Sequence, residues 1–445
     1  MSTEELFADH ITALTREYVA ALQAAGVAGQ SVLIHSGCAH DYYADDHAVP
    51  FRAWGHYLRW VPVDHPDQFV LIRPGHKPLF FAVIPQDFWH DPNLDMPAWW
   101  ADQFDIVILG NRSQLARELD TLKTQRSQLS FLGEDTAFAA ALGMAAAAIN
   151  PAPLLSHLDF QRAFKTAYEV HRISAANAHA LTGHQAAQEA FLAGGAEYDI
   201  HMAYLQACRV LDNELPYPNI VALNQHAATL HYQHKARSNR TPSQVLLIDA
   251  GCRSHGYCSD ITRTWARPGT NAVFVELLAG MKKLQRAVIA SISPGLSYAD
   301  LHLSAHRMLA RLLADTSICR GTVDELLEEQ ITTAFMPHGL GHFLGLQVHD
   351  VGGRMAGPDG SVQPPPAQFP ALRTTRVIEN HMVFTIEPGV YFIPMLLDPL
   401  RTGPRSALLN WTLIDTLIPL GGIRIEDNIW MHDNQAHNLT LRPTK

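Results

Sequence analysis

Two acidic residues stand at the ends of apolar, strand-sized runs, and no other feature constrains the fold as strongly. Asp249 closes the run Val-Leu-Leu-Ile at 245–248, and Glu387 follows Val-Phe-Thr-Ile at 383–386. A carboxylate that ends a buried strand needs partners, because an unpaired buried charge is very costly. The chain must therefore fold so that other polar groups or cations meet these two acids.

A third acid, Asp260, lies a short way beyond Asp249 and opens the run Asp-Ile-Thr-Arg-Thr-Trp. Two short strands joined by residues 251–259 would bring both carboxylates to one place. Two carboxylates that lie close together repel each other strongly unless a cation lies between them. The spacing therefore predicts a cation beside the two aspartates.

Two further groups extend the pattern. Glu426 lies in Ile-Arg-Ile-Glu at 423–426, where the two-residue period of a strand places Arg424 and Glu426 on one face. His342 ends the glycine-rich run His-Gly-Leu-Gly-His at 338–342, where the backbone can approach a ligand closely. Four carboxylates and one imidazole would suit two divalent ions about 3.5–4 Å apart and hydrolysis by a bridging hydroxide. The alternative is that each acid is an ordinary capping, turn or salt-bridge residue.

The length of 445 residues exceeds what one compact core holds, so we expect two domains. The fold class predicted is α+β, with a smaller α/β domain over residues 1–155 and a second domain over 156–445. Periodicity predicts an N-terminal helix capped by Ser2 and Glu5 and ended by Gly26. It also predicts strands at 32–34, 69–72, 79–84, 106–109, 129–132, 245–248, 261–265, 383–386 and 423–431, helices at 113–123, 136–149, 158–192, 196–212, 271–291 and 297–314, and a proline-rich surface loop at 354–373.

Composition excludes several classes of protein. A net charge of −10 with no basic patch argues against a nucleic-acid partner. The longest apolar run, 137–149, is too short to span a membrane and predicts a buried helix. Five widely spaced cysteines and no visible secretory signal predict a reducing cytoplasm, and no CxxC pair marks a zinc or redox motif.

These strings resemble the metal-dependent proline peptidases of the pita-bread fold, and within them most closely the bacterial Xaa-Pro dipeptidases (prolidases) and organophosphorus acid anhydrolase. The strings are Ile-Asp-Ala-Gly at 248–251, Ser-Asp-Ile-Thr-Arg-Thr-Trp at 259–265, the run from His338 to Asp350, Thr-Ile-Glu-Pro-Gly-Val-Tyr at 385–391 and Arg-Ile-Glu-Asp at 424–427. The likeness extends into the first domain through 45–51 and 85–90. It implies a pita-bread catalytic domain preceded by the smaller α/β domain.

The resemblance implies a centre of two divalent ions per subunit, most often Mn²⁺, which the oxygen-rich donor set suits. Asp260 and Glu426 would bridge both ions. Asp249 would complete the shell of one ion, and His342 and Glu387 that of the other.

The resemblance also assigns roles around the centre. Glu387 would shuttle the proton to the departing proline nitrogen, and His349 would help hold the scissile carbonyl. His231 would lie near the proline end of the substrate, and Arg373 would take the dipeptide carboxylate. The remaining positions are Arg424 beside the bridging glutamate, His338 and Tyr217 in the pocket wall, and Asp45 and Trp89, which would reach the neighbour's substrate in a homodimer.

The function implied is hydrolysis of the imide bond before a C-terminal proline in small dipeptides. X-Pro bonds lack an N–H and restrict the neighbouring geometry, so general peptidases handle them poorly. Cleavage of longer Xaa-Pro peptides, as by aminopeptidase P, and phosphotriester hydrolysis as a side activity remain alternatives. The intact set of five ligand residues disfavours a non-catalytic binding protein.

Overall fold

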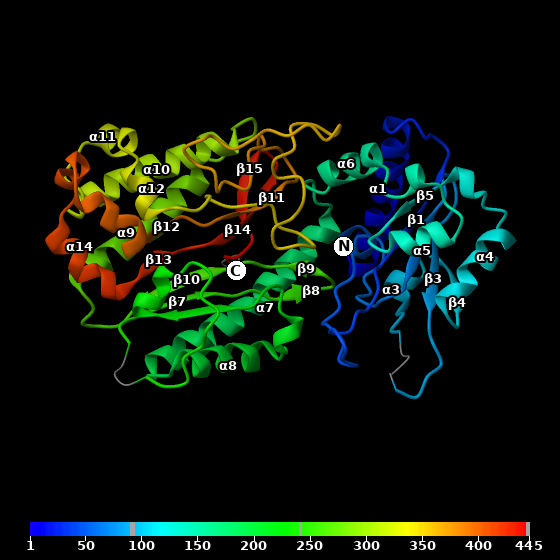
Figure 1. Cartoon of the computed structure of the whole chain (residues 1–445), viewed down its shortest axis with the longest axis horizontal. Coiled ribbons are helices and arrows are strands. Elements are labelled where there is room, and N and C mark those ends of the chain that lie inside the picture. Colours follow the sequence, from blue (N-terminus) through cyan, green and yellow to red (C-terminus); the bar gives the residue numbers. More distant parts are fainter. Residues whose placement is uncertain (90–93, 240–242, 442–445) are drawn as a thin grey trace. The chain divides into compact units, whose positions relative to one another are not determined.

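The structure is a computed structural model that describes residues 1–89, 94–239 and 243–441 (Figure 1). The chain divides into two compact units. The first unit comprises Met1–His171 and Ala356–Ser361, and the second comprises Arg172–Met355 and Val362–Lys445. Among the described residues, no helix combines the length and apolar composition needed to cross a membrane.

A long N-terminal helix opens the first unit. Helix α1 (Thr3–Ala24) begins with the predicted capping box, in which Ser2 and Glu5 bond each other's backbone N–H. The chain leaves the helix at Gly26, whose φ of 73° lies in the left-handed region that favours glycine. The predicted helix is therefore confirmed with both of its end signals.

A five-stranded mixed sheet forms the centre of the first unit, in the order β4-β3-β2-β1-β5. Helices α4 and α5 pack on the sheet face that carries Phe69, Leu71 and Phe81. The five predicted strands are confirmed to within about one residue at each end. The elements are β1 (Ser31–His35), β2 (Phe69–Ile72), β3 (Leu79–Val83), β4 (Asp105–Leu109), β5 (Leu129–Leu132), α2 (Gly55–Leu58), α3 (Ala98–Ala101), α4 (Leu115–Thr121), α5 (Thr136–Ala141) and α6 (Ala152–Gln161).

Two helix predictions are wrong in the first 192 residues. The expected buried helix over 136–149 ends early, because α5 stops at Ala141 and Gly143 adopts a φ of 81°. The expected helix over 158–192 is two helices, α6 and α7 (Ala167–Leu192). The second of these has its own start, since Thr166 N–H donates to Glu169 Oε2 and Glu169 N–H donates to Thr166 Oγ1.

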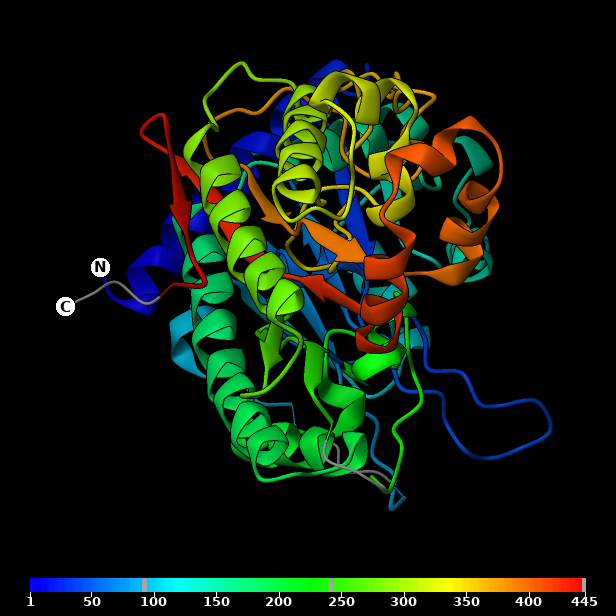
Figure 2. The same ribbon diagram turned by 90° about the vertical axis from the view of Figure 1, so that its left-hand side faces the viewer.

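The second unit places short strands between helices. In Figures 1 and 2 the strands lie between α7 and α8 on one side and α9 and α10 on the other. Three-stranded sheets run β10-β7-β6 and β11-β14-β15, and β12-β13 and β8-β9 are pairs. The elements are β6 (Ile220–Leu223), β7 (Val245–Asp249), β8 (Arg253–Ser254), β9 (Tyr257–Cys258), β10 (Thr262–Ala266), β11 (Val383–Ile386), β12 (Gly389–Tyr391), β13 (Gly422–Arg424), β14 (Asp427–His432), β15 (Gln435–Asn438), α8 (Glu197–Cys208), α9 (Ala272–Ala290), α10 (Tyr298–Asp315), α11 (Val323–Glu328), α12 (Ile331–Phe335), α13 (Pro394–Leu397) and α14 (Trp411–Leu417).

The single strand predicted over 423–431 is wrong, because it is divided between two sheets. β13 pairs with β12 and β14 pairs with β11, and Glu426 lies in the break. Other partners satisfy the backbone there: Glu426 N–H donates to Thr262 O, and Arg263 donates to Glu426 O. The loop at 354–373 contains no helix or strand, as predicted.

Candidate metal centre

Antiparallel strands β7 and β10 bring Asp249 and Asp260 together, as the connection at 251–259 predicts. Asp249 pairs in register with Thr262, two residues beyond Asp260. The Tyr217 hydroxyl lies 2.7 Å from Asp249 Oδ1 and 2.6 Å from Asp260 Oδ1. One hydroxyl has one proton to donate, so the two buried carboxylates share a donor that cannot satisfy both at once.

Two glycines allow this close approach. A Cβ on Gly251 would lie 2.0 Å from Ser259 O, where the chain turns between the aspartates. A Cβ on Gly341 would lie 2.1 Å from Thr385 O, where the segment before His342 crosses β11. Any side chain at either position would force the backbone apart, so glycine is required on steric grounds.

His342 faces two carboxylates. Its Nε2 lies 3.3 Å from Asp260 Oδ2 and 3.5 Å from Glu387 Oε1, and its Nδ1 lies 3.0 Å from Phe343 O. A carbonyl only accepts, so Nδ1 carries a proton and donates it. Burial lowers the pKa of the ring, but the hydrogen bond to Asp260 and the charge of Glu387 outweigh it and raise that pKa. Once Nε2 has lost its proton, its lone pair can bind a cation.

Arg424 ties the two halves of the site together. Its guanidinium donates to Asp249 Oδ2 at 2.7 Å, to Thr262 Oγ1 at 3.1 Å and to the Tyr391 hydroxyl oxygen at 2.9 Å. Thr262 Oγ1 in turn donates to Glu426 Oε2 at 2.6 Å. Arg424 and Glu426 therefore lie on one face, as the strand period predicts, with the Thr262 hydroxyl between them.

Burial and mutual repulsion make the carboxylates hard to ionise together. Burial raises the pKa of Asp249 to about 6 although Arg424 opposes the shift, and it raises that of Glu387 to about 7 although His342 opposes it. Burial and the charge of Asp260 raise the pKa of Glu426 well above its usual range. Asp260 differs, because its contacts with His342 outweigh its burial and lower its pKa. All four carboxylates can therefore be ionised together only if further positive charge enters the cavity.

These residues fit divalent cations. One ligand atom from each of Asp260, His342 and Glu426 lies within 4.8 Å of the others. Carboxylate oxygens and a neutral imidazole nitrogen suit hard and borderline ions, and a bound cation would remove the repulsion that raises the carboxylate pKa values.

The five residues of the centre line a cavity of about 270 Å³. Several predicted substrate-binding and catalytic residues line it together with the five acidic and imidazole groups. Besides those five, the wall is formed by Leu230, His231, Pro337, His338, Gly339, Gly341, His349, Ala371, Arg373 and Arg424.

Two of the lining histidines are neutral. The His349 ring lies edge-on to His342, with the centroids 4.3 Å apart, and burial together with the charges of His342 and Arg373 lowers its pKa to about 3. His338 Nε2 lies 3.0 Å from the Tyr391 hydroxyl, and burial with the charge of Arg424 lowers its pKa to about 3. Both rings can therefore exchange hydrogen bonds without adding charge.

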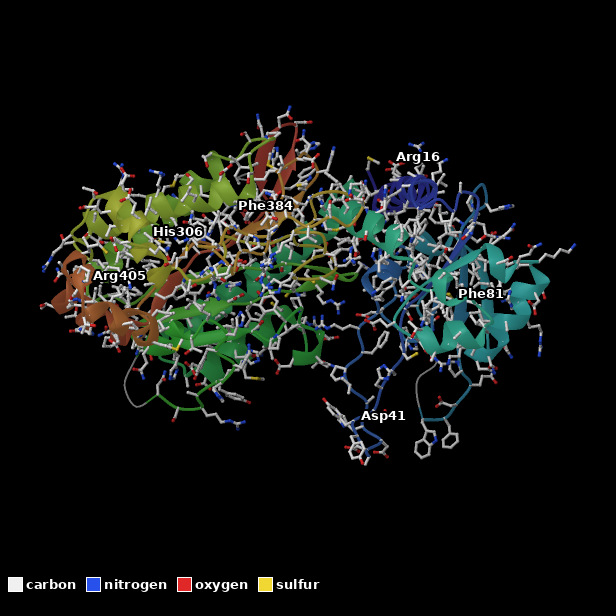
Figure 3. The ribbon with its side chains drawn as sticks, turned by 45° about the horizontal axis from the view of Figure 1, so that its top comes forward. Arg16, Asp41, Phe81, His306, Phe384 and Arg405 are labelled. Atoms are coloured by element: carbon white, nitrogen blue, oxygen red, sulfur yellow. The ribbon has the colours of Figure 1, made fainter. Side chains whose placement is uncertain are left out.

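Asp45 and Trp89 lie in exposed segments of the first unit. Asp45 Oδ1 accepts from the N–H groups of Asp46 and His47, within a projecting segment that also carries Asp41 (Figure 3). The Trp89 ring packs against Phe88, with 4.8 Å between the centroids. The last residue of the motif at 85–90, His90, lies outside the described residues.

Three neutral residues that hold the site were missed by the sequence analysis. Thr262 and Tyr391 accept hydrogen bonds from Arg424. The Asn428 side chain binds the backbone of Asp260, accepting from its N–H at 3.2 Å and donating to its carbonyl at 2.5 Å. Each lies within or beside a motif that the sequence does display. Their neutral side chains give no local signal of this role.

Comparison with known proteins identifies the family. Residues 171–433 match metallopeptidase family M24, and residues 5–160 match the N-terminal domain of Xaa-Pro dipeptidase. The chain belongs to metallopeptidase family M24. It is 43% identical over 439 residues to a Xaa-Pro dipeptidase of Pseudoalteromonas atlantica, covering 98% of each chain, and 44% identical over 444 residues to one of Aeromonas hydrophila, covering 99% of this chain and 98% of the relative.

Solved structures of bacterial aminopeptidases share the fold of the chain. Proline aminopeptidase P II from Yersinia pestis aligns over 96% of both chains with a TM-score of 0.71 and 22% identity. Aminopeptidase PepP of Pseudomonas aeruginosa aligns over 96% of this chain and 94% of that chain, with a TM-score of 0.69 and 21% identity. The predicted fold class, a pita-bread catalytic domain after a smaller N-terminal domain, is confirmed.

Proposed function

We propose that this protein is a metal-dependent Xaa-Pro dipeptidase that cleaves dipeptides before a C-terminal proline. One observation carries the proposal: the chain matches Xaa-Pro dipeptidases over nearly its whole length and retains four carboxylates and His342 around one buried cavity. A small peptide substrate suits a cavity of about 270 Å³.

Divalent metal binding follows from M24 membership, and we propose two ions, Mn²⁺ by preference. Asp260 and Glu426 would serve both ions, Asp249 one, and His342 with Glu387 the other. When bound, the ions supply Lewis-acid polarisation and lower the pKa of coordinated water. The hard oxygen donors and the single imidazole support this choice of metal.

Protein side chains would handle the protons of the reaction. The Glu387 carboxylate, which lines the cavity, can take a proton from the attacking water and deliver it to the proline nitrogen. That nitrogen leaves as a secondary amine and must be protonated. Neutral His349 would donate a hydrogen bond to the scissile carbonyl, and Arg424 would hold Asp249 and Thr262 in place.

Three other lining residues, Arg373, His231 and His338, and Tyr217, which bonds the two aspartates, would contact the substrate. Arg373 would bind the free carboxylate of the dipeptide, and His231 would contact the proline end. His338 and Tyr217 would complete the wall, which the hydrogen bond from the Tyr391 hydroxyl to His338 Nε2 and those from the Tyr217 hydroxyl to the aspartates support.

Assembly as a homodimer would complete the site. We propose that the domain at 1–155 caps the partner's cavity, with Asp45 meeting the substrate ammonium and Trp89 forming a wall. The large exposed area of Trp89, at 78%, supports a role that needs a second surface. Five free cysteines support a reducing cytoplasmic location, and the net charge of −10 supports the absence of a nucleic-acid partner.

A second candidate is aminopeptidase P activity on longer Xaa-Pro peptides, which the similarity in fold to aminopeptidase P structures favours. Phosphotriester hydrolysis is a further possible side activity of the same site. The experiment that tests the main proposal is an assay of proline release from Ala-Pro after chelation and after reloading with Mn²⁺. Activity that chelation leaves intact would contradict it.

A further inference from the structure

An irregular segment forms one wall of the cavity. Leu230 and His231 line the cavity, yet the chain from 229 to 236 adopts neither helix nor strand. His231 itself is exposed, and among the described residues its side chain has no hydrogen bond. Its position must therefore be set through its neighbours in the chain.

One buried carboxylate holds this segment in place through hydrogen bonds. Glu197, the first residue of α8, is fully buried and accepts four hydrogen bonds. Its Oε1 accepts from Leu223 N–H at 3.0 Å and from His226 Nδ1 at 2.6 Å. Its Oε2 accepts from the Tyr232 hydroxyl and from Ala236 N–H, each at 2.8 Å. All four donors come from residues 223–236, on both sides of His231.

Two further contacts stabilise the same segment. The rings of His226 and Tyr232 stack, with centroids 4.6 Å apart and planes 19° apart. Tyr198 N–H donates to Ala236 O at 3.1 Å, so the first turn of α8 also holds the end of the segment. A buried carboxylate without partners is costly, so withdrawing any one donor weakens a fully satisfied network.

We propose that Glu197 is a positioning residue for substrate binding, which acts by fixing Tyr232 and thereby the adjacent His231 at the cavity wall. This rests on the proposed function, in which His231 contacts the proline end of the dipeptide. His226 then has a defined role as well, because it donates to Glu197 and stacks on Tyr232.

The direct test is a double-mutant cycle between Tyr232→Phe and His231→Ala, measured on Ala-Pro with the metal-loaded enzyme. Tyr232→Phe removes only the hydroxyl that meets Glu197. It should raise KM roughly five- to tenfold and leave kcat within about twofold, because binding is lost rather than chemistry. In the His231→Ala background the same change should cost less than about twofold. Tyr198→Phe is the matched control. Tyr198 follows Glu197 in the chain but its hydroxyl does not bond Glu197, so the same loss of a hydroxyl should leave KM unchanged.

A readout independent of activity follows the segment itself. In Glu197→Gln, amide hydrogen exchange should quicken across 223–236 and stay at the wild-type rate in α9 and α10. Equal losses for Tyr232→Phe in both backgrounds, a wild-type KM for His231→Ala, or exchange that quickens throughout the chain would each overturn the proposal. Failure of the wild-type enzyme to cleave any Xaa-Pro dipeptide would instead overturn the proposed function, and the exchange measurement would still decide whether Glu197 holds this wall.

Discussion

Replacement of Arg373 by alanine tests whether this residue binds the free carboxylate of the dipeptide. Arg373 lines the cavity, its side chain is exposed, and among the described residues it makes no hydrogen bond or ion pair. Its backbone is held independently, since Arg354 donates to Leu372 O and Thr375 N–H donates to Gly353 O. Removing the guanidinium should therefore leave the fold and the metal centre unchanged.

The size of the effect follows from the chemistry of the contact. A dipeptide presents a free carboxylate, which a guanidinium can bind with two parallel charge-assisted hydrogen bonds. Hydrogen bonds to charged groups contribute about 1.5–3 kcal/mol, which is roughly ten- to a hundredfold. Because the Arg373 side chain is exposed, solvent screening favours the lower part of that range. Arg373→Ala should lower kcat/KM for Ala-Pro by roughly tenfold or more. The kcat/KM of Arg373→Lys should lie between that of the wild type and that of Arg373→Ala.

The assay compares Ala-Pro with Ala-Pro amide, whose neutral end offers no charge to the guanidinium. Arg373→Ala should lower kcat/KM far less for the amide than for the dipeptide, and the metal content should stay at the wild-type level. Arg320→Ala is the control, because Arg320 is also exposed and lies outside the cavity lining, and in the part of the chain that the structure describes its side chain makes no hydrogen bond or ion pair. Equal losses on the two substrates would mean that Arg373 supports the loop and does not read the carboxylate.

Three further predictions concern metal, pH and assembly. Asp260→Asn should lower bound metal from two equivalents to one or fewer and abolish turnover, as elemental analysis and proline release would show; two retained equivalents would contradict a bridging role. Burial raises the pKa of Asp249 from 3.8 to about 6 and that of Glu387 from 4.5 to about 7, so the metal-free fold binds protons more tightly than the unfolded chain. That stability is complete below about pH 4 and is lost as pH rises through 6 to 7, by roughly 3 kcal/mol per group. Histidines that are buried in the neutral form, such as His338 and His349, change stability in the opposite direction between pH 5 and pH 8. The test is therefore the gain in melting temperature when Mn²⁺ is added to chelated protein, which should grow with pH; a pH-independent gain would contradict the prediction. Light scattering should show a homodimer, and mixing Asp45→Ala with Asp260→Asn protein should restore activity through mixed dimers; an active monomer would refute the shared site.

Sequence analysis predicted the elements whose signal is local. The strands at 69–72, 129–132 and 383–386 have the predicted bounds, because each is a short and largely apolar run next to polar or turn residues. The same signal failed over 136–149, where an alanine-rich run is apolar on average but turns at Gly143. It failed again over 423–431, where the chain changes sheets without any interruption of the strand pattern.

The charged part of the site was predictable and the neutral part was not. Asp249 and Glu387 stand out because a carboxylate at the end of an apolar strand is costly, and that cost implies a partner. Thr262, Tyr391 and Asn428 carry no such cost, and their contacts join residues more than thirty positions apart in the chain. Only the tertiary structure could reveal them.

The most direct test of the central claim compares Ala-Pro with Ala-Pro-Ala on the Mn²⁺-loaded wild-type enzyme. Arg373 at the cavity wall predicts that the free carboxylate next to the cleaved bond is required. Proline release from Ala-Pro should therefore exceed alanine release from Ala-Pro-Ala by roughly tenfold or more in kcat/KM, and chelation should abolish both. Equal or faster cleavage of the tripeptide would contradict the dipeptidase assignment and make the protein an aminopeptidase P.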